Sequence, residues 1–226
     1  MHSMAPDTEQ DTSSASTPST GKAAASARAE PGRFESARPV LETLFTHYPQ
    51  LFGAQFLPLK LGIFQELLAA HPTVFERESL KTALGVHARS TRYLQAVAAS
   101  QKRYGLDGQP CEDLAPEHIY FAIVEIFRRR QKRTPDDLRP KVRRQLLAAF
   151  EASGLERQDY LAKVQTKDEA SNALIEDALA ELDERHAKEA ALLRAYDASG
   201  KTPEEFADMY GMRLRDVTAA LARRKT

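Results

Sequence analysis

The chain has 226 residues, 42% of them hydrophobic and 28% charged, which is enough for one or two domains with a core. Its single cysteine, Cys111, excludes an intramolecular disulfide and a cysteine-rich zinc site. No stretch approaches the roughly 18 apolar residues that cross a bilayer, and the N-terminus lacks the apolar core of a secretory signal. We therefore expect the protein to lie in a reducing compartment, the cytoplasm, and not in a membrane.

The formal net charge is zero, but the charges are distributed unevenly along the chain. Residues 1–37 carry 3 basic and 5 acidic side chains, residues 38–150 carry 17 and 11, and residues 151–226 carry 12 and 16. The middle is therefore a module of net charge +6 between flanks of −2 and −4. A basic module of this kind favours the binding of a polyanion.

The first segment, residues 1–37, contains no Leu, Ile or Val and is rich in Ser, Thr, Ala and Pro. Such a segment buries too little apolar surface to offset its ordering entropy, so we expect a disordered tail. Regular structure is expected to begin near Arg38. Apolar residues at helical spacing from Val40 to Tyr48 predict a helix that Pro49 ends.

Further helices and one hairpin are predicted in the middle of the chain. After a loop at 50–58, apolar spacing places helices at 59–68, at 76–86, from the N-cap Ser90 to about 97, and from Pro116 into the arginines at 128–130. The pair Asp107-Gly108, flanked by apolar residues, predicts a β-hairpin. The fold class is therefore α+β and predominantly helical, with about five helices and a small hairpin followed by a helical C-terminal region.

The C-terminal region, residues 155–226, is polar and helix-prone. Its apolar seam lapses at 185–189, so a regular coiled coil is not expected. Residues 202–224 predict two helices joined at Gly211, with the spacing of a helix-turn-helix and with basic residues on or beside the second helix: Arg213, Arg215, Arg223 and Arg224. A DNA-binding regulator acting through this helix pair is thus an alternative function, although Glu204, Glu205 and Asp208 would repel phosphate.

The sequence does not have the pattern of an enzyme. None of the six histidines is spaced so that two ligands share a helix face, and neither a Gly-rich phosphate loop nor a GxSxG elbow is present. We expect no catalytic residue, no metal and no cofactor.

Three motifs in the middle of the chain resemble those of a known family. Residues 58–65 read PLKLGIFQ, residues 80–94 read LKTALGVHARSTRYL, and residues 103–110 read RYGLDGQP. In this order and spacing, over roughly residues 38–135, they resemble the ProQ/FinO family of RNA-binding proteins. Gly105 stands where the family usually has Asp, and Glu112 where Gly is common, which we interpret as variations of the hairpin. The tail does not resemble the Tudor-like domain of the longer family members.

The resemblance implies an RNA chaperone that binds a stem-loop with a single-stranded 3′ tail, as at intrinsic terminators. It implies partners among small RNAs and mRNA 3′ ends in post-transcriptional regulation, with DNA disfavoured, and we expect a monomer. A ribosome-associated adaptor is a further alternative. The expected domains are a disordered tail at 1–37, an RNA-binding domain at 38–135, a basic extension or linker at 136–154 and a helical region at 155–226.

The resemblance also selects candidate RNA-binding residues. Tyr93 would stack on a base or offer its hydroxyl, Arg103 would present a planar fork of donors to a phosphate, and the helix opening at Gly62 would favour an oxyanion. Ser90 and six cations complete the set, which are Lys60, Arg77, Lys81, Arg89, Arg92 and Lys102. A secondary basic extension contains Arg128, Arg129, Arg130, Lys132 and Arg133. The alternatives are solvated surface charges, a half-buried core role for Tyr93 and a structural ion pair for Arg92.

Overall fold

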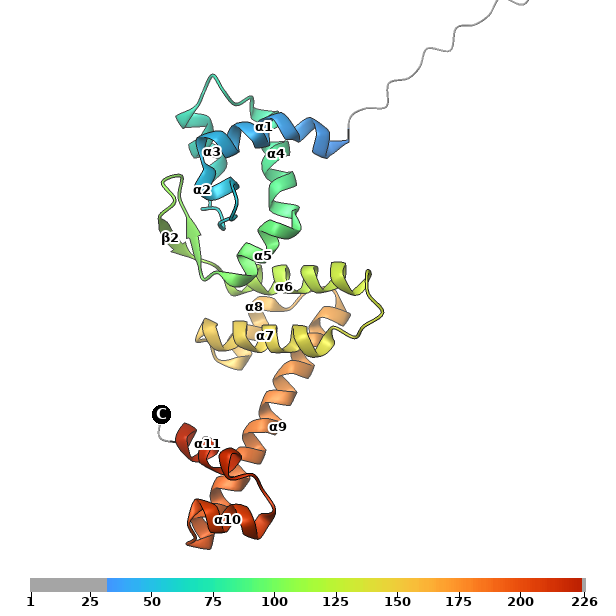
Figure 1. The fold of residues 1–226 in the computed structure, drawn as a ribbon. Helices are drawn as coiled ribbons and strands as arrows, with labels where there is room; N and C mark the ends of the chain where they lie inside the picture. Colours follow the sequence, from blue (N-terminus) through green and yellow to red (C-terminus); the bar gives the residue numbers. More distant parts are fainter. Residues whose placement is uncertain (1–31, 225–226) are drawn as a thin grey trace, which may run out of the picture. The chain divides into compact units, whose positions relative to one another are not determined.

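The computed structural model describes residues 32–224 (Figure 1). Within them the elements, in chain order, are α1 (Arg33–His47), α2 (Pro49–Phe52), α3 (Ile63–Ala70), α4 (Arg77–Arg89), α5 (Thr91–Ala99), β1 (Lys102–Tyr104), β2 (Pro110–Asp113), α6 (Pro116–Gln131), α7 (Arg139–Ser153), α8 (Arg157–Val164), α9 (Glu169–Ser199), α10 (Pro203–Tyr210) and α11 (Leu214–Arg224). The predicted fold class, helical with one small antiparallel hairpin, is confirmed. None of the described helices is long and apolar enough to cross a membrane.

The first helix begins five residues earlier than the sequence predicted. Arg33 opens α1, and Ala37 is buried one turn before Leu41 and two before Leu44, so the buried face of the helix includes the end of the segment expected to be disordered. Residues 1–31 of that segment lie outside the described residues.

The junction of α4 and α5 follows the predicted capping chemistry. The Glu76 carboxylate caps α4 by accepting from the amides of Glu78 and Ser79. The Ser90 hydroxyl accepts from the amide of Tyr93 at 3.1 Å and caps α5, as predicted. Because the two helices are separated by Ser90 alone, the orientation of Tyr93 is tied to the end of α4.

Residues 58–60 run beside the hairpin in an extended conformation, where the sequence pattern had suggested the start of a helix. The amide of Lys60 donates to the carbonyl of Tyr104 at 2.9 Å, and the amide of Tyr104 donates to the carbonyl of Pro58 at 2.8 Å. Gly62, at φ +81°, then turns the chain into α3. The pairing with β1 competes with helical hydrogen bonds here, so α3 starts only at Ile63.

A single apolar core extends from α1 to the first half of α9. Helix α6 packs against α5, α7 and α8, and the buried Tyr120 hydroxyl donates to the carbonyl of Ser171 in α9 at 2.6 Å. The segment expected to be a basic linker is largely the helix α7, which buries Val142, Leu146 and Leu147 in this core. Leu146 and Leu147 follow Val142 by four and five residues, which places the three on one side of the helix. The many arginines between and around them made this apolar side hard to recognise in the sequence.

A second, smaller cluster lies at the end of the chain. Phe206 and Ala207 of α10 and Val217 of α11 are buried against Leu192, Ala195 and Tyr196 of α9, among others. The capping box between Thr202 and Glu205 begins α10, and Gly211 ends it as predicted. Between the two clusters, α9 runs without interruption through the polar stretch 183–188, whose side chains are exposed.

The separation of the two clusters predicts separate unfolding. Phe206→Ala should remove about 3–5 kcal/mol of packing from the second cluster and raise amide hydrogen exchange in α10 and α11, while α4 to α6 keep their protection. Leu146→Ala, in the main core, is the matched control and should loosen α6 and α7. Equal loss of protection in α5 and α10 after Phe206→Ala would show one cooperative unit instead.

Candidate functional site

The backbone of Leu59 joins the three sequence motifs. Its amide donates to the hydroxyl of Tyr93 at 3.0 Å, and its carbonyl accepts from Arg103 Nη1 at 2.9 Å. Leu59 lies in the first motif, Tyr93 in the second and Arg103 in the third. The fixed order and spacing of the motifs therefore correspond to one buried set of hydrogen bonds.

A pocket of about 270 Å³ opens beside this set of bonds. We call it the Tyr93 pocket. Its lining comes from the turn before α3, the end of α4, α5, β1, the residue after β2 and the first turns of α6, and consists of Leu61, Ala88, Tyr93, Leu94, Val97, Arg103, Leu114, His118 and Phe121. The structure thus places Tyr93 and Arg103 in one pocket, with apolar walls around a few polar groups.

Burial limits what Tyr93 can offer. Its side chain is only 8% exposed, and burial raises the pKa of its hydroxyl above the usual value. The phenolic oxygen accepts from the Leu59 amide, while the hydroxyl hydrogen has no acceptor among residues 32–224. Of the two roles predicted for Tyr93, donation of a hydrogen bond fits this geometry, and stacking on the ring face does not.

Arg103 is also 8% exposed, and its donors point into the protein. Besides the bond to Leu59, Nη2 lies 3.0 Å from Nδ1 of His118, and Nε lies 3.9 Å from Glu112. Since arginine has only donors, Nδ1 of His118 accepts, which leaves the imidazole hydrogen on Nε2. The guanidinium places positive charge beneath the pocket, but its fork is engaged internally and is not presented outward.

Two exposed apolar side chains at the Tyr93 pocket were absent from the prediction. Phe121 is 57% exposed and Leu61 is 63% exposed. Phe121 falls outside the apolar stripe of Ile119 and Ile123 on α6, and an aromatic residue off the buried stripe was the signal available in the sequence. His118, three residues before Phe121, was set aside because it has no metal-ligand spacing.

The other predicted residues of the family domain are distributed around these elements. Lys60 is ion-paired with Glu66, which raises the pKa of its amine, and Lys102 is ion-paired with Asp113. Lys81 lies 3.6 Å from Glu78. Arg77 stands over the ring of Phe64, Arg89 donates to the carbonyl of Gly85, and Arg92 donates to the carbonyl of Ala54 at 2.6 Å while covering the ring of Phe56. Gly62 and Ser90 act through backbone conformation and helix capping. None of these residues lines the Tyr93 pocket.

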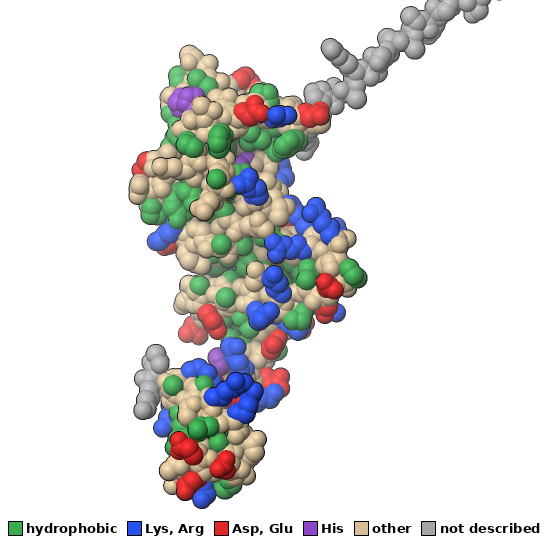
Figure 2. Space-filling model, in the orientation of Figure 1, with side chains coloured by type: hydrophobic (Ala, Val, Ile, Leu, Met, Phe, Trp, Pro, Cys, Tyr) green, Lys and Arg blue, Asp and Glu red, His purple; other side chains and the backbone are tan. Residues whose placement is uncertain are grey.

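The basic extension divides into structural and free cations. Arg128 bonds Ser171 and Asp168 of the α9 region, and Arg129 bonds the carbonyl of Arg89 at 2.8 Å and the hydroxyl of Thr91. Arg139 pairs with Asp137, whereas five other exposed cations of α6, the following loop and α7 have no side-chain hydrogen bond or ion pair to any described residue. We call them the basic patch, which consists of Arg130, Lys132, Arg133, Lys141 and Arg144. Figure 2 shows blue side chains gathered over the part of the molecule where α6 and α7 lie.

The arginines of the C-terminal helix pair are occupied. Arg213 and Arg215 pair with Asp216, and the two at the end of α11, Arg223 and Arg224, pair with Glu189 and Asp197 of α9. Their charge is largely neutralised within the chain. Nothing in this described part of the structure favours the DNA-binding alternative.

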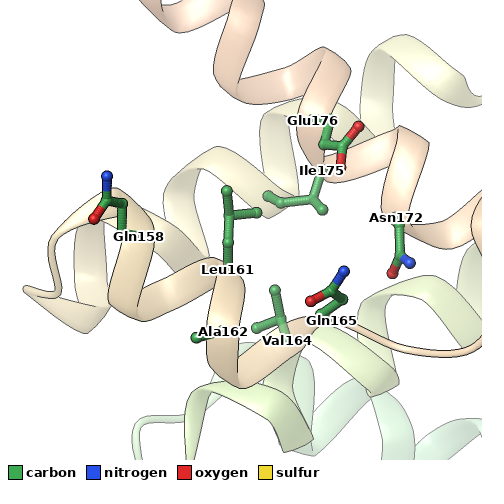
Figure 3. Close-up of a pocket in the computed structure, with 8 residues that line it drawn as sticks. All are labelled: Gln158, Leu161, Ala162, Val164, Gln165, Asn172, Ile175 and Glu176. Carbon is green, nitrogen blue, oxygen red and sulfur yellow. The ribbon is translucent and has the colours of Figure 1, made fainter.

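A second pocket, of about 350 Å³, lies between α8 and α9 (Figure 3). Its walls are apolar side chains with amides and one carboxylate: Gln158, Leu161, Ala162, Val164, Gln165, Asn172, Ile175 and Glu176. This lining contains no cation, so it offers nothing to attract a phosphate.

His87 lies behind the Tyr93 pocket, in an aromatic cluster. It is 4% exposed, its ring centre is within 4.4–5.0 Å of those of Phe52, Phe56 and Tyr93, and its Nε2 is buried without a partner among the described residues. Burial, and then the charge of Arg92, lower the pKa of His87 from 6.5 to about 4. The folded state therefore holds this imidazole neutral.

Comparison with known proteins places this region in context. Residues 34–139 match the sequence model of the ProQ/FINO family. The RNA chaperone ProQ of Shewanella frigidimarina is 35% identical over 113 residues, and that of Shewanella oneidensis is 36% identical over 97 residues. These alignments cover 48% and 41% of this chain and 52% and 46% of the relatives, so the chain spans about half the length of the curated relatives it matches.

Among solved structures, that of a FinO-like RNA chaperone from Neisseria meningitidis is 30% identical, with a TM-score of 0.35, over 38% of this chain and 88% of that one. The residues matched by the family model contain α2 to α6, nearly all of α1 and every residue that lines the Tyr93 pocket.

The buried imidazole predicts a pH dependence of stability. Because the pKa of His87 is lower in the folded chain than in the unfolded chain, the unfolded state takes up a proton first. The stability that the neutral ring contributes is present above about pH 6.5 and is lost as the pH falls to about 4, by about 3 kcal/mol. Urea unfolding at pH 7 and pH 4 should show a smaller loss for His87→Phe than for the parent chain. The same loss in both proteins would contradict this assignment.

Proposed function

Residues 34–139 form a domain of the ProQ/FINO family, and on that premise we propose that this chain is an RNA chaperone that binds structured RNA. The target that fits best is a stem-loop with a single-stranded 3′ tail, such as a terminator hairpin, in small RNAs and at mRNA 3′ ends. Pairing between such RNAs in post-transcriptional regulation is the activity proposed. A single chain performs this activity by binding RNA, without a covalent step.

The Tyr93 pocket is the observation that carries this proposal. It offers the hydroxyl hydrogen of Tyr93, the Nε2 hydrogen of His118 and the buried charge of Arg103, beneath an exposed ring, Phe121. Polar donors within apolar walls suit a ribose and a base at a chain end, since bases stack on exposed aromatic rings. We therefore assign the last nucleotides of the tail to this pocket, with Phe121 as the stacking ring.

The basic patch is the proposed contact for the stem. A-form RNA hides its bases in a deep groove, so a protein reads a stem through phosphates and 2′-hydroxyls. Arg129 connects this part of α6 to Arg89 and Thr91 at the α4–α5 junction, next to Ala88 of the pocket. Arg130, the member of the patch on α6, thus lies on the same helix as Phe121, beyond the residues that line the pocket, where a stem would follow the tail.

A titration tests the proposed function as a whole. One hairpin would be offered with a single-stranded 3′ tail, without the tail, and as a DNA duplex of equal length, all at one stated salt concentration. We expect the tailed hairpin to bind at least tenfold more tightly than the other two. Equal affinity for the tailed and blunt hairpins would reject the pocket assignment, and preference for the duplex would reject RNA as the ligand.

Removing the aromatic ring of Phe121 should weaken the binding of the single-stranded 3′ tail and leave binding of the stem unchanged. Phe121→Ala should weaken binding of the tailed hairpin about tenfold, because a base stacked on an aromatic ring contributes about 1–3 kcal/mol, and should leave the blunt hairpin unchanged. Phe45→Ala is the matched control, since Phe45 is 50% exposed on α1 and does not line the pocket. Equal weakening of both hairpins by Phe121→Ala would contradict a stacking role.

Loss of the patch should affect every RNA alike. The double variant Lys132→Ala, Arg133→Ala should weaken tailed and blunt hairpins by the same factor, and should reduce the slope of log affinity against log salt by about 0.7–0.9 for each phosphate that the protein no longer neutralises. Lys188→Ala removes a cation that is already paired with Glu184 and should change neither quantity. A slope unaltered in the double variant would remove the patch from the binding surface.

A further inference from the structure

Helix α10 carries acidic side chains and exposed apolar side chains together. It contains Glu204, Glu205 and Asp208 and no basic residue. Glu205 serves the capping box, whereas the carboxylates of Glu204 and Asp208 have no hydrogen bond or ion pair with any residue from 32 to 224. Met209 and Tyr210, at the end of the helix, are 50% and 56% exposed. We call Glu204, Asp208, Met209 and Tyr210 the acidic surface.

The packing of the second cluster does not account for these side chains. Phe206 and Ala207 are the α10 residues buried in that cluster, and Met209 takes no part in it. Positions 204 and 208 are four apart, so they share one side of α10, and Met209 lies next to them. A flexible thioether side chain fits irregular apolar gaps, and two carboxylates beside it favour a cationic partner. The acidic surface therefore suits an apolar gap that is bordered by cations.

The basic patch borders such a gap. A crevice of about 20 Å³ opens between α6 and α7, with Phe127, Leu138 and Val142 among its walls, and Arg130 and Lys141 of the patch also line it. A space of this size holds about one water molecule, and therefore also the terminal methyl group of a methionine. Figure 2 shows blue side chains where α6 and α7 lie and red side chains where α10 lies. The two surfaces are complementary in charge and in their apolar parts.

The acidic surface does not reach the basic patch of its own chain. Near its start, α9 is bonded to α6, where Arg128 contacts Ser171. From Ser171, α9 continues as one helix to Ser199, a span of about 42 Å at ~1.5 Å per residue. Helix α10 follows that far end, so an unbroken α9 keeps the two surfaces apart. A second copy of the chain can present its patch without this limit.

We propose that the acidic surface docks on the basic patch of a second copy, with Met209 in the crevice between α6 and α7, and that RNA displaces it. Each chain has one surface of each kind, so the contact is head to tail and can continue from chain to chain. A stem presents many phosphates to the same cations and therefore competes with two carboxylates. Free chains associate, and the RNA-bound chain is single. Only the displacement by RNA rests on the proposed function.

Sedimentation velocity of the full chain tests the association. At low salt the average mass should rise with protein concentration, and at high salt it should fall to that of one chain, because contacts between exposed charges are screened. A saturating amount of the blunt hairpin should convert the protein into complexes of one chain and one RNA. A parent chain that stays single at every concentration at low salt would overturn the proposal.

Two variants, each altered at one surface, test the head-to-tail arrangement. The α10 variant is Glu204→Gln with Asp208→Asn, and the patch variant is Arg130→Ala with Lys141→Ala. Each alone should associate at least tenfold more weakly than the parent chain. In an equal mixture, the intact patch of the first meets the intact acidic surface of the second, so dimers should return and no longer species should form. A mixture that forms no dimers would rule out this pairing of surfaces.

The control variant is Glu156→Gln with Asp159→Asn, which removes two charges from the α8 region, where neither carboxylate has an ion pair with the described residues. It should associate as the parent chain does. Equal weakening by the control would reduce the effect to net charge, and stronger association of the α10 variant would show that acidic surfaces meet each other; either result contradicts the proposal.

The arm with RNA separates the two proposals. The α10 variant should bind hairpins as the parent chain does, because its altered residues lie outside the proposed RNA contacts. Chains that stay associated while the hairpin is bound would contradict the shared use of the patch. A hairpin that does not bind at all would reject the proposed function and leave the head-to-tail contact to be judged by the mixture of variants.

Discussion

The peptide group of Leu59 carries the interaction on which the rest of the domain depends. Its amide and carbonyl are both satisfied by side chains, the first by Tyr93 and the second by Arg103. Buried backbone groups without partners are costly, so this segment keeps its extended path only while both side chains stay in place. The same two bonds hold Tyr93 in the first turn of α5 and Arg103 on β1. A helix junction, a hairpin and an extended segment are thereby arranged around one pocket.

Some cations of the chain form hydrogen bonds or ion pairs within the fold, and others do not. Arg103 donates hydrogen bonds to the carbonyl of Leu59 and to His118. Arg128 connects α6 to α9, and Arg129 connects it to the α4–α5 junction. The acidic C-terminal region neutralises others, because carboxylates of α9 pair with Arg143 and Arg157. Around α6 and α7, the cations of the basic patch remain without an ion pair to any described residue. Net charge by segment therefore located the basic region but overstated how much of it is available.

Much of the fold could be predicted from local pattern. The capping role of Ser90, the Asp107-Gly108 hairpin, the length of α6 and the turn at Gly211 depend on neighbouring residues, whose chemistry is legible in the sequence. The start of α3 and the helix α7 were harder to predict. Residues 58–60 pair with Tyr104, more than forty positions away, and α7 is recognisable as a core helix only through its packing against α6 and α9.

The sequence by itself indicated the resemblance to the ProQ/FinO family and the two polar residues at the centre of the domain, because Leu59, Tyr93 and Arg103 each lie in one of the three motifs. Only the tertiary structure decided which surfaces those residues present. Tyr93 and Arg103 are buried, the first bonded to the Leu59 amide and the second to the Leu59 carbonyl and His118, and Phe121, Leu61 and Glu112 stand exposed or half-exposed around them. Exposure depends on which distant segments cover a side chain, and Leu61 and Glu112 meet across 51 positions of the chain. Such contacts cannot be predicted from residue type and helical spacing.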